Sequence, residues 1–326
     1  MMKDPETGAL KPFNFGNILD QMPVLKQFGY QIDTIEFAPL IDSSNANGEF
    51  WIKLVRIIKE NYGKYDGFVI LHGTDTMAYT ASALSFMLED LYKPVILTGS
   101  QLPIGTLRTD GKENLITSIE IAAAKHNGDA LVPEVCICFE SKLYRGNRTT
   151  KHNAEHFNAF KSYNYPILAE AGINIKYNSK SIHYPEHKKL LKVYDKLDEN
   201  IAILKIFPNL GKNLVESILN IKDLKALIIE TYGSGNALTD KWFLDLIKNA
   251  TEKGLIILNV TQCQAGSVNM GTYETSTDLL KYGVLNGFDI TIEAATTKLM
   301  FLLGQNLKTE EVKMYLKTSI AGEITM

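Results

Sequence analysis

The segment HGTDTMAY places a hydroxyl beside a carboxylate, because Thr74 and Asp75 follow closely on an apolar run that ends at Leu71. A threonine hydroxyl can act as a nucleophile in acyl transfer when a neighbouring base takes its proton. Threonine and aspartate are also ordinary helix N-caps, since their oxygens accept hydrogen bonds from the free N–H groups of the first turn. Capping is the plainer interpretation of this segment alone, and an acyl-transfer site is the alternative.

A candidate base stands in the segment RGNRTTKHN, where Lys151 follows two threonines. A desolvated lysine is one of the side chains that can accept a proton from a hydroxyl. Lys151 held near Thr74 and Asp75 would complete a Thr–Lys–Asp group suited to acyl transfer. Taken singly, Lys151 is more typical of a solvated surface lysine, because lysine is rarely buried.

Patterns for other chemistries are weak. The histidines form no HExxH motif, and the i, i+4 spacing of His152 and His156 indicates one face of a short solvated helix. No GxSxG segment is present, so the serine elbow of an α/β-hydrolase is not supported. The cysteines at 136, 138 and 263 have the spacing of neither a zinc site nor a disulfide framework.

The segment YGSGNAL has only part of a dinucleotide-binding fingerprint. Gly233 and Gly235 fill its first two glycine positions, but the third falls on Leu238. We therefore interpret these glycines as a tight turn that presents Asn236.

The elements that must position these residues alternate along the chain. Nearly continuous Val/Ile/Leu runs predict strands buried on both faces, and the intervening segments have helical period. Strands are expected at 67–71, 94–99, 134–139, 201–207, 226–233 and 255–263, and helices at 77–91, 112–126, 213–220, 240–250, 276–284, 293–304 and 308–318. This order predicts an α/β fold, with a three-layer domain built on a mostly parallel sheet and a second, smaller α/β domain.

Residues 175–199 separate the two series of alternating strands and helices. This stretch is polar and lysine-rich, which suggests a domain boundary. We predict an N-terminal domain at 1–180, a linker at 181–199 and a C-terminal domain at 200–326. In open parallel sheets, ligands bind beyond the carboxyl ends of the strands. This rule selects the segments that follow the strands, together with the polar loop PLIDSSN at 39–45.

Composition excludes several partners. The formal net charge is −3, and the lysines are scattered, so a nucleic-acid partner is not expected. No stretch approaches the roughly 20 apolar residues that a membrane span needs. Hydrophobic residues make up 45% of the chain and charged residues 22%, which favours a folded globular protein over a disordered one.

Seven segments in this order resemble the bacterial-type L-asparaginases, most closely their cytosolic type I branch. They are DSSN (42–45), GFVILHGTDTMAYTASALSFMLE (67–89), GSQLP (99–103), LYRGNRTTKH (143–152), YGSGNA (232–237), NVTQCQAGSVNMG (259–271) and DITIEAATTKLMFLL (289–303). The resemblance covers nearly the whole chain. It implies hydrolysis of L-asparagine to L-aspartate and ammonia through a threonine acyl-enzyme, in the cytoplasm, with neither a metal nor an organic cofactor.

The resemblance also implies roles for individual residues. Thr74, Asp75 and Lys151 match the catalytic Thr–Lys–Asp group, and Thr74 and Asp75 would also bind substrate, with Asp75 holding the α-ammonium. The substrate α-carboxylate would bind at the loop of Asp42, Ser43 and Ser44. Asn236 and Glu293 match positions that complete a neighbouring subunit's site, which implies a homodimer or homotetramer.

The sequence departs from the family in two places. It contains no TGGTIG-like segment, which carries the primary nucleophile threonine in the family, and Ala9 stands nearest to the place of an activating tyrosine. We therefore expect this chain to hydrolyse asparagine slowly or not at all. Truncation of a complete enzyme is the favoured explanation, and a non-catalytic amino-acid-binding remnant is the alternative.

The second departure concerns regulation. Some type I enzymes bind asparagine at an activating site, where an arginine contacts the effector carboxylate. Glu230 stands at the place of that arginine, and two carboxylates repel each other. We predict that asparagine does not activate this protein.

Overall fold

The computed structural model describes residues 2–3, 10–11, 22–104, 106–185, 189–271 and 274–325 of the 326-residue chain. Position 9 lies outside these residues, so the structure says nothing about Ala9. The chain divides into two compact units. Unit 1 comprises residues 1–162 and 166–193, and unit 2 comprises residues 163–165 and 194–326.

Unit 1 is built on a six-stranded sheet in the order β13-β12-β9-β8-β5-β3. Its parallel part consists of β3 (Phe68–Leu71), β5 (Val95–Thr98) and β8 (Val135–Phe139), which are three of the predicted strands. The other three strands run antiparallel to their neighbours and are β9 (Lys142–Arg145), β12 (Ala169–Ala171) and β13 (Ile175–Tyr177). The α/β class is confirmed, and this sheet is mixed because β9 returns from β8 through a two-residue turn.

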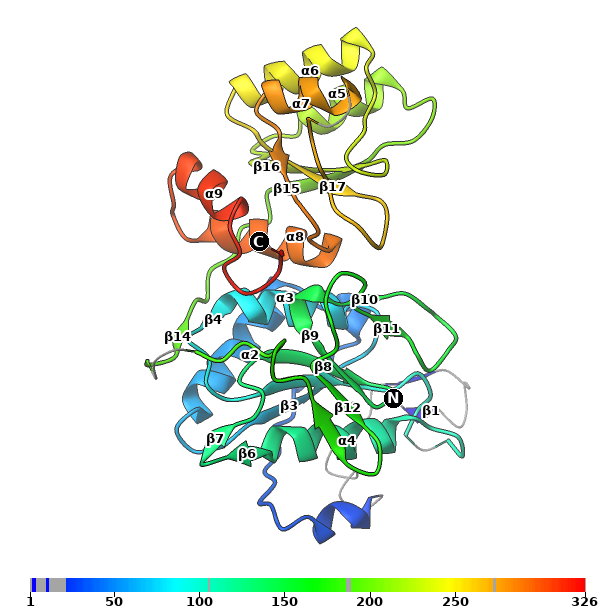
Figure 1. The fold of residues 1–326 in the computed structure, drawn as a ribbon, viewed down its shortest axis with the longest axis vertical. Coiled ribbons are helices and arrows are strands. Elements are labelled where there is room, and N and C mark those ends of the chain that lie inside the picture. Colours follow the sequence, from blue (N-terminus) through cyan, green and yellow to red (C-terminus); the bar gives the residue numbers. More distant parts are fainter. Residues whose placement is uncertain are drawn as a thin grey trace. The chain divides into compact units, whose positions relative to one another are not determined.

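Helices cover both faces of this sheet. Figure 1 shows α3 (Met77–Met87) and α4 (Gly111–Ala123) on opposite sides, and both contact β5 and β8. Helix α2 (Gly48–Asn61) packs against α3. The two 3-10 turns at Ser43–Asn45 (η3) and Gly146–Arg148 (η4) carry polar segments predicted from the sequence, and a third, η2, spans Pro23–Gln27.

Two helices of unit 1 end earlier than predicted. Helix α3 stops at Met87 because β4 (Leu88–Glu89) pairs with β14 (Lys192–Val193), a strand inside the predicted linker. Helix α4 stops at Ala123, before a hairpin of β6 (Lys125–His126) and β7 (Asp129–Ala130). The hairpin turn is Asn127–Gly128, and both residues have positive φ. Asn-Gly is a strong hairpin signal that the helical interpretation of 112–126 overlooked.

The remaining strands of unit 1 form short antiparallel pairs. They are β1 (Met2–Lys3) with β2 (Leu10–Lys11), and β10 (Thr150–Lys151) with β11 (Phe160–Lys161). The second pair corrects one prediction. His152 and His156 lie in the connection between β10 and β11, which is not helical, so their spacing does not mark a helix face.

Unit 2 contains a four-stranded parallel sheet in the order β15-β16-β17-β18. The strands are β15 (Ile201–Lys205), β16 (Ala226–Thr231), β17 (Ile256–Thr261) and β18 (Leu285–Asn286). The helices are α5 (Lys212–Leu219), α6 (Lys241–Glu252), α7 (Glu274–Lys281), α8 (Ile292–Gly304) and α9 (Thr309–Leu316). Figure 1 shows α5, α6 and α7 on one face of this sheet and α8 on the other. The second α/β domain is therefore confirmed.

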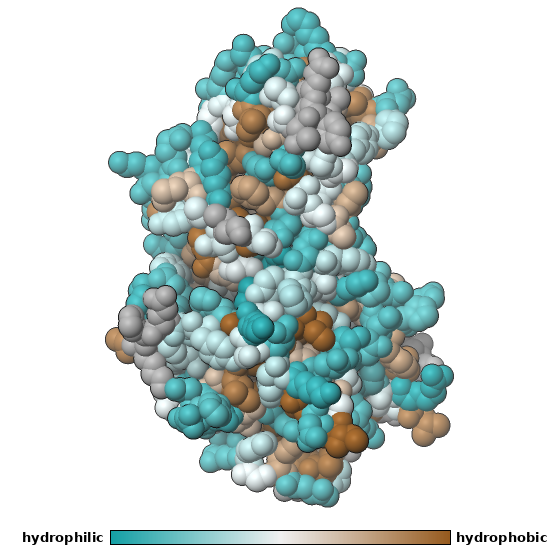
Figure 2. Space-filling model, in the orientation of Figure 1, coloured by the Kyte–Doolittle hydropathy of each residue, from teal (hydrophilic) through white to brown (hydrophobic). Residues whose placement is uncertain are grey.

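The face of the molecule seen in Figure 2 is predominantly hydrophilic. Figure 2 shows hydrophilic residues over most of the visible face of each unit, with smaller hydrophobic patches interspersed. Within the part of the chain that the structure describes, no helix is long and apolar enough to cross a membrane.

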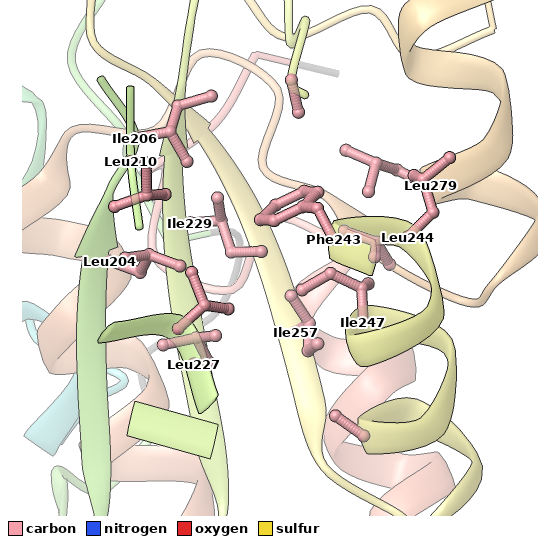
Figure 3. Packing of buried hydrophobic residues seen from close by; sticks show 14 of the residues in the cluster. Leu204, Ile206, Leu210, Leu227, Ile229, Phe243, Leu244, Ile247, Ile257 and Leu279 are labelled. Atoms are coloured by element: carbon pink, nitrogen blue, oxygen red, sulfur yellow. The ribbon is translucent and has the colours of Figure 1, made fainter. Parts of the chain in front are cut away.

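The core of unit 2 forms where α6 packs on the sheet. Phe243 and Ile247 of α6 are fully buried and face Ile229 of β16 and Ile257 of β17 (Figure 3). The apolar residues of α6 recur at helical spacing, so one stripe of this helix meets the sheet and its lysines remain outside.

Candidate active site

Thr74 emerges from the carboxyl end of the parallel strands. In the register of β3 and β5, Leu71 lies opposite Thr98, so Thr74 and Gln101 each follow this pair by three residues. The Thr74 hydroxyl donates a hydrogen bond to Gln101 Oε1 at 3.1 Å. The N-cap of α3 is Thr76, whose hydroxyl donates instead to the Ser43 carbonyl at 2.6 Å. The capping interpretation of Thr74 and Asp75 is therefore wrong.

Lys151 reaches this edge on β10. Its Nζ donates to Thr74 Oγ1 at 2.8 Å and to Asp75 Oδ1 at 2.7 Å. The Lys151 side chain is 19% exposed and that of Asp75 is 65% exposed. Lys151 is therefore not the solvated surface lysine that its residue type suggests. The structure brings together three side chains that the sequence separates by up to 77 positions.

Close backbone packing directs β10 toward α3. Turn η4 lies against α3 so closely that a Cβ at Gly146 would stand 2.9 Å from the Ala81 Cβ. The Thr149 hydroxyl donates to the Arg145 carbonyl at 2.7 Å across the same turn. Small residues at this crossing therefore let the chain turn toward Thr74 before Lys151.

The loop of Asp42, Ser43 and Ser44 lies against the same edge. The Ser44 backbone N–H donates to Asp42 Oδ1 at 3.0 Å and its hydroxyl donates to the same oxygen at 2.8 Å. The hydrogen bond from the Ser44 backbone lowers the pKa of Asp42 most, and the bond from the Ser44 hydroxyl lowers it further. A Cβ at Gly73 would stand 2.4 Å from Ser43 Oγ, so glycine is required for this close approach.

A buried histidine supports the turn from beneath. His72 donates from Nδ1 to the Gly73 carbonyl at 2.6 Å, which leaves Nε2 to accept from the Thr80 hydroxyl at 2.9 Å. Trp51 Nε1 donates to the same hydroxyl at 2.9 Å. Burial lowers the pKa of His72. This residue was not predicted as part of the site, although a lone histidine between an apolar strand and a Gly-Thr-Asp turn was the available signal.

Gln101 was also missed as an individual site residue. Its Nε2 donates to the carbonyls of Ala154 and His156, at 3.2 and 3.1 Å, in the connection that follows Lys151. The signal that could have identified it is the parallel pairing of β3 with β5, since residues at equal distances beyond neighbouring strands meet at one edge.

Asn236 and Glu293 belong to unit 2, whereas the other predicted site residues belong to unit 1. Asn236 closes the tight turn after β16, where its N–H donates to the Tyr232 carbonyl at 2.9 Å and Gly233 and Gly235 have positive φ. Glu293 stands in the first turn of α8 with 6% of its surface exposed. Across the described ranges, no group of three His, Cys, Asp or Glu side chains is placed to share a metal ion.

The geometry of unit 1 suits proton handling at a hydroxyl. An ammonium between a hydroxyl oxygen and a carboxylate stabilises negative charge at the hydroxyl oxygen, and the neutral amine could accept the hydroxyl proton. Helix α3 begins at Met77, two residues after Asp75, and the backbone N–H groups of a helix's first turn point toward its N-terminal end, where they can stabilise a developing oxyanion.

Two family models match consecutive parts of the chain. The model "Asparaginase, N-terminal" matches residues 1–183, and the model "Glutaminase/Asparaginase C-terminal domain" matches residues 200–316. Among curated relatives, L-asparaginase 1 of Escherichia coli is 46% identical over 290 residues, covering 89% of this chain and 84% of that protein. A mouse 60 kDa lysophospholipase is 41% identical over 293 residues, covering 90% of this chain and 51% of that protein.

A solved structure shows the same similarity. The crystal structure of L-asparaginase I from Vibrio cholerae superposes with a TM-score of 0.89 at 41% identity, covering all of this chain and 95% of that one. Fold, family models and sequence identity over most of the chain therefore agree. This chain belongs to the asparaginase family of enzymes.

Proposed function

We propose that this protein is an L-asparagine amidohydrolase that forms L-aspartate and ammonia through a threonine acyl-enzyme. Identity of 46% to an L-asparaginase over 89% of the chain supports the substrate. The observation that carries the proposal is the pair of hydrogen bonds from Lys151 Nζ to Thr74 and Asp75. An amidase needs this combination of a hydroxyl, a proton carrier and a fixed charge.

In this proposal two parts of the site bind the two charged ends of a zwitterionic substrate. The Asp75 carboxylate is exposed enough to receive the substrate α-ammonium while it holds Lys151. Ser43, with donors from the loop of Asp42 and Ser44, holds the α-carboxylate. The scissile amide then lies over Thr74, where Lys151 moves a proton to or from the Thr74 hydroxyl. No metal or cofactor is needed for these steps.

We further propose that full activity requires a threonine on a TGGTIG-like strand, which residues 1–326 do not contain. Strand β3 supports this proposal. Among the described residues β3 pairs only with β5, and its four residues are half-buried, whereas every residue of β5 and β8 is buried. A parallel strand along this edge would satisfy its backbone groups and end beside Thr74.

Three further proposals rest on the resemblance to type I enzymes. The protein assembles as a homodimer or homotetramer in which Asn236 and Glu293 contribute to a neighbouring subunit's site, and it acts in the cytoplasm. Asparagine does not activate it, because Glu230 at the end of β16 would repel an effector carboxylate. A sigmoidal dependence of rate on asparagine concentration would contradict this last proposal.

The direct test measures ammonia release from L-asparagine. We compare the 326-residue chain with the same chain preceded by a strand and a TGGTIG segment. The extended chain should be faster by more than about a hundredfold, because the upstream threonine supplies the primary nucleophile beside the proton-handling pair of Thr74 and Lys151. In the extended chain, Lys151→Met should lower kcat by about a hundredfold or more.

Lys176→Met is the matched control, because Lys176 is exposed on β13, and it should leave kcat unchanged. Equal rates for the short and extended chains would contradict the need for the upstream threonine. Absence of ammonia from both chains, with calorimetric binding of L-aspartate, would instead support the non-catalytic amino-acid-binding alternative.

A further inference from the structure

Gln101 connects Thr74 to the chain segment that follows Lys151. The Thr74 hydroxyl lies 3.1 Å from Gln101 Oε1, and Gln101 Nε2 lies 3.2 and 3.1 Å from the carbonyl oxygens of Ala154 and His156. One planar amide therefore contacts both the turn after β3 and the connection between β10 and β11.

These contacts fix which way the amide faces. Two carbonyl oxygens can only accept, so the NH2 group of Gln101 must point toward Ala154 and His156. The opposite orientation would place Oε1 against two other acceptors. Oε1 therefore faces Thr74, and because Oε1 carries no hydrogen, the Thr74 hydroxyl must donate to it.

The backbone of Gln101 is itself anchored. Both carboxylate oxygens of Asp110 accept from the Gln101 N–H, at 3.1 and 3.0 Å, and Oδ1 also accepts from the Leu102 N–H at 3.1 Å. Asn114, which is 3% exposed, donates to Asp110 Oδ2 at 3.2 Å and to the Gly99 carbonyl at 3.0 Å. Both of these side chains, Asp110 and Asn114, lie on or beside the first turn of α4. They fix the backbone from which the Gln101 side chain extends.

We propose that Gln101 is a positioning residue for the reaction at Thr74: its amide orients the Thr74 hydroxyl and holds the connection after Lys151 at the distance that lets Nζ reach that hydroxyl. This inference rests on the proposed amidohydrolase function. It assigns a role to a side chain that contacts the reacting group but does not exchange a proton with it.

The orientation of the Thr74 hydroxyl affects the order of the proton-transfer steps. In the resting site the hydroxyl proton of Thr74 points to Gln101, and a lone pair of Oγ1 accepts from the Lys151 ammonium. Transfer of that proton to Lys151 requires the neutral amine and a rotation of the hydroxyl away from Gln101. Gln101 therefore keeps the hydroxyl in a defined orientation while Lys151 is an ammonium.

The test uses two substitutions that separate the two ends of the amide. Gln101→Met removes the acceptor and both donors at similar length. Gln101→Glu keeps an acceptor for Thr74 but removes both donors. We expect Gln101→Met to lower kcat by about tenfold, the effect of one neutral hydrogen bond, with KM changing less than threefold. Gln101→Glu should retain a larger share of kcat than Gln101→Met.

The NH2 end of the Gln101 amide is tested in the 326-residue chain. Hydrogen–deuterium exchange is measured there for peptides covering residues 150–161. Both variants should exchange roughly tenfold faster there, because both lose the bonds to the carbonyls at 154 and 156. Gln305→Met is the matched control. Gln305 Nε2 also donates to two backbone carbonyls, at 2.9 and 2.8 Å, but in unit 2, so its loss should change neither readout.

The kinetics are measured in the chain extended with TGGTIG. A wild-type extended chain that releases ammonia, with an unchanged kcat in Gln101→Met, would overturn the positioning role while the proposed function stands. Unchanged exchange over 150–161 would overturn the anchoring of the connection. An inactive wild-type extended chain would overturn the proposed function, and with it the inference.

Discussion

At the scale of single residues, the Thr74 hydroxyl accepts a hydrogen bond from one side chain and donates one to another. Lys151 Nζ donates to it and Gln101 Oε1 accepts from it. Oγ1 keeps a second lone pair, which can face a substrate carbonyl. A threonine held in this way is oriented before substrate arrives, which reduces the entropy that the reaction would otherwise lose.

His72 should make stability depend on pH. Burial lowers its pKa in the folded state, so the unfolded chain takes up a proton first as the pH falls below about 6.5. The stability that neutral His72 contributes is therefore complete above that pH and is lost as the pH falls through the folded-state pKa. The expected slope is up to about 1.4 kcal/mol per pH unit.

Urea unfolding at pH 7 and pH 5 measures this slope. His72→Asn should reduce the difference in unfolding free energy between the two pH values, because the titrating group is gone. His126→Asn serves as the control, since His126 is exposed on β6. An unchanged pH slope in His72→Asn would rule out this source of acid sensitivity.

Gly73→Ala should damage the loop that we propose binds the substrate. The added methyl group would meet buried Ser43 at 2.4 Å from Oγ and 2.8 Å from Cβ, so the loop must move. Overpacking of this kind costs about 1–3 kcal/mol, and we expect L-aspartate affinity to fall by about tenfold or more.

Calorimetric titration with L-aspartate checks this prediction. Gly63→Ala is the control, because a Cβ there meets no atom within 4 Å. If both variants bound L-aspartate as tightly as the wild-type chain, the loop of Ser43 would not form part of the binding site.

At the scale of elements, one face of α8 holds the end of the chain through a buried ion pair. Lys298 Nζ lies 2.5 Å from Glu323 Oε1, and both side chains are fully buried. Lys298 also donates to the Thr318 carbonyl at 2.7 Å, and Glu323 accepts from the N–H groups of Ile320 and Ala321. Every polar group of the pair thus has a protein partner, as burial requires.

Removing one member of this pair should be costly. Glu323→Gln leaves Lys298 as a buried charge without a counter-charge, and we expect a loss of about 3–5 kcal/mol in unfolding free energy. Asp245→Asn breaks the exposed i, i+4 pair with Lys241 and should cost much less, because water already solvates both charges. Urea unfolding of both variants measures the two losses of unfolding free energy. Equal losses would contradict the expectation that burial makes an ion pair more costly to break.

At the scale of the whole molecule, the proposed assembly predicts complementation between two inactive variants. Lys151→Met disables the site of its own chain, whereas Asn236→Ala disables the site to which it contributes in a neighbour. In a mixed dimer, one of the two sites then contains neither substitution. Random mixing should restore about a quarter of the wild-type activity, since half of the dimers are mixed and each has one intact site.

The measurement unfolds and refolds the two extended variants together and follows ammonia release. Refolding each variant alone gives the baseline. If the mixture showed only the sum of the baselines, Asn236 would not act across a subunit interface. Sedimentation analysis of the same samples gives the oligomeric state directly.

Much of this protein follows from its sequence. The runs GFVIL, PVILTG and EVCICF were placed as strands within one or two residues, because Val, Ile and Leu without polar interruptions fit strands buried on both faces. The long segment around Thr74 identified the family. The antiparallel half of the first sheet was not predicted, since its strands are short and partly polar.

Only the tertiary structure decided what Thr74 contacts. Whether it caps a helix, or bonds to a lysine 77 positions away and a glutamine 27 positions away, depends on the parallel register of β3 with β5 and on the packing of η4 against α3. Local sequence sets which elements form, because hydrophobic period and turn residues act over a few positions. Contacts between distant side chains depend on how those elements pack, and no short segment contains that information.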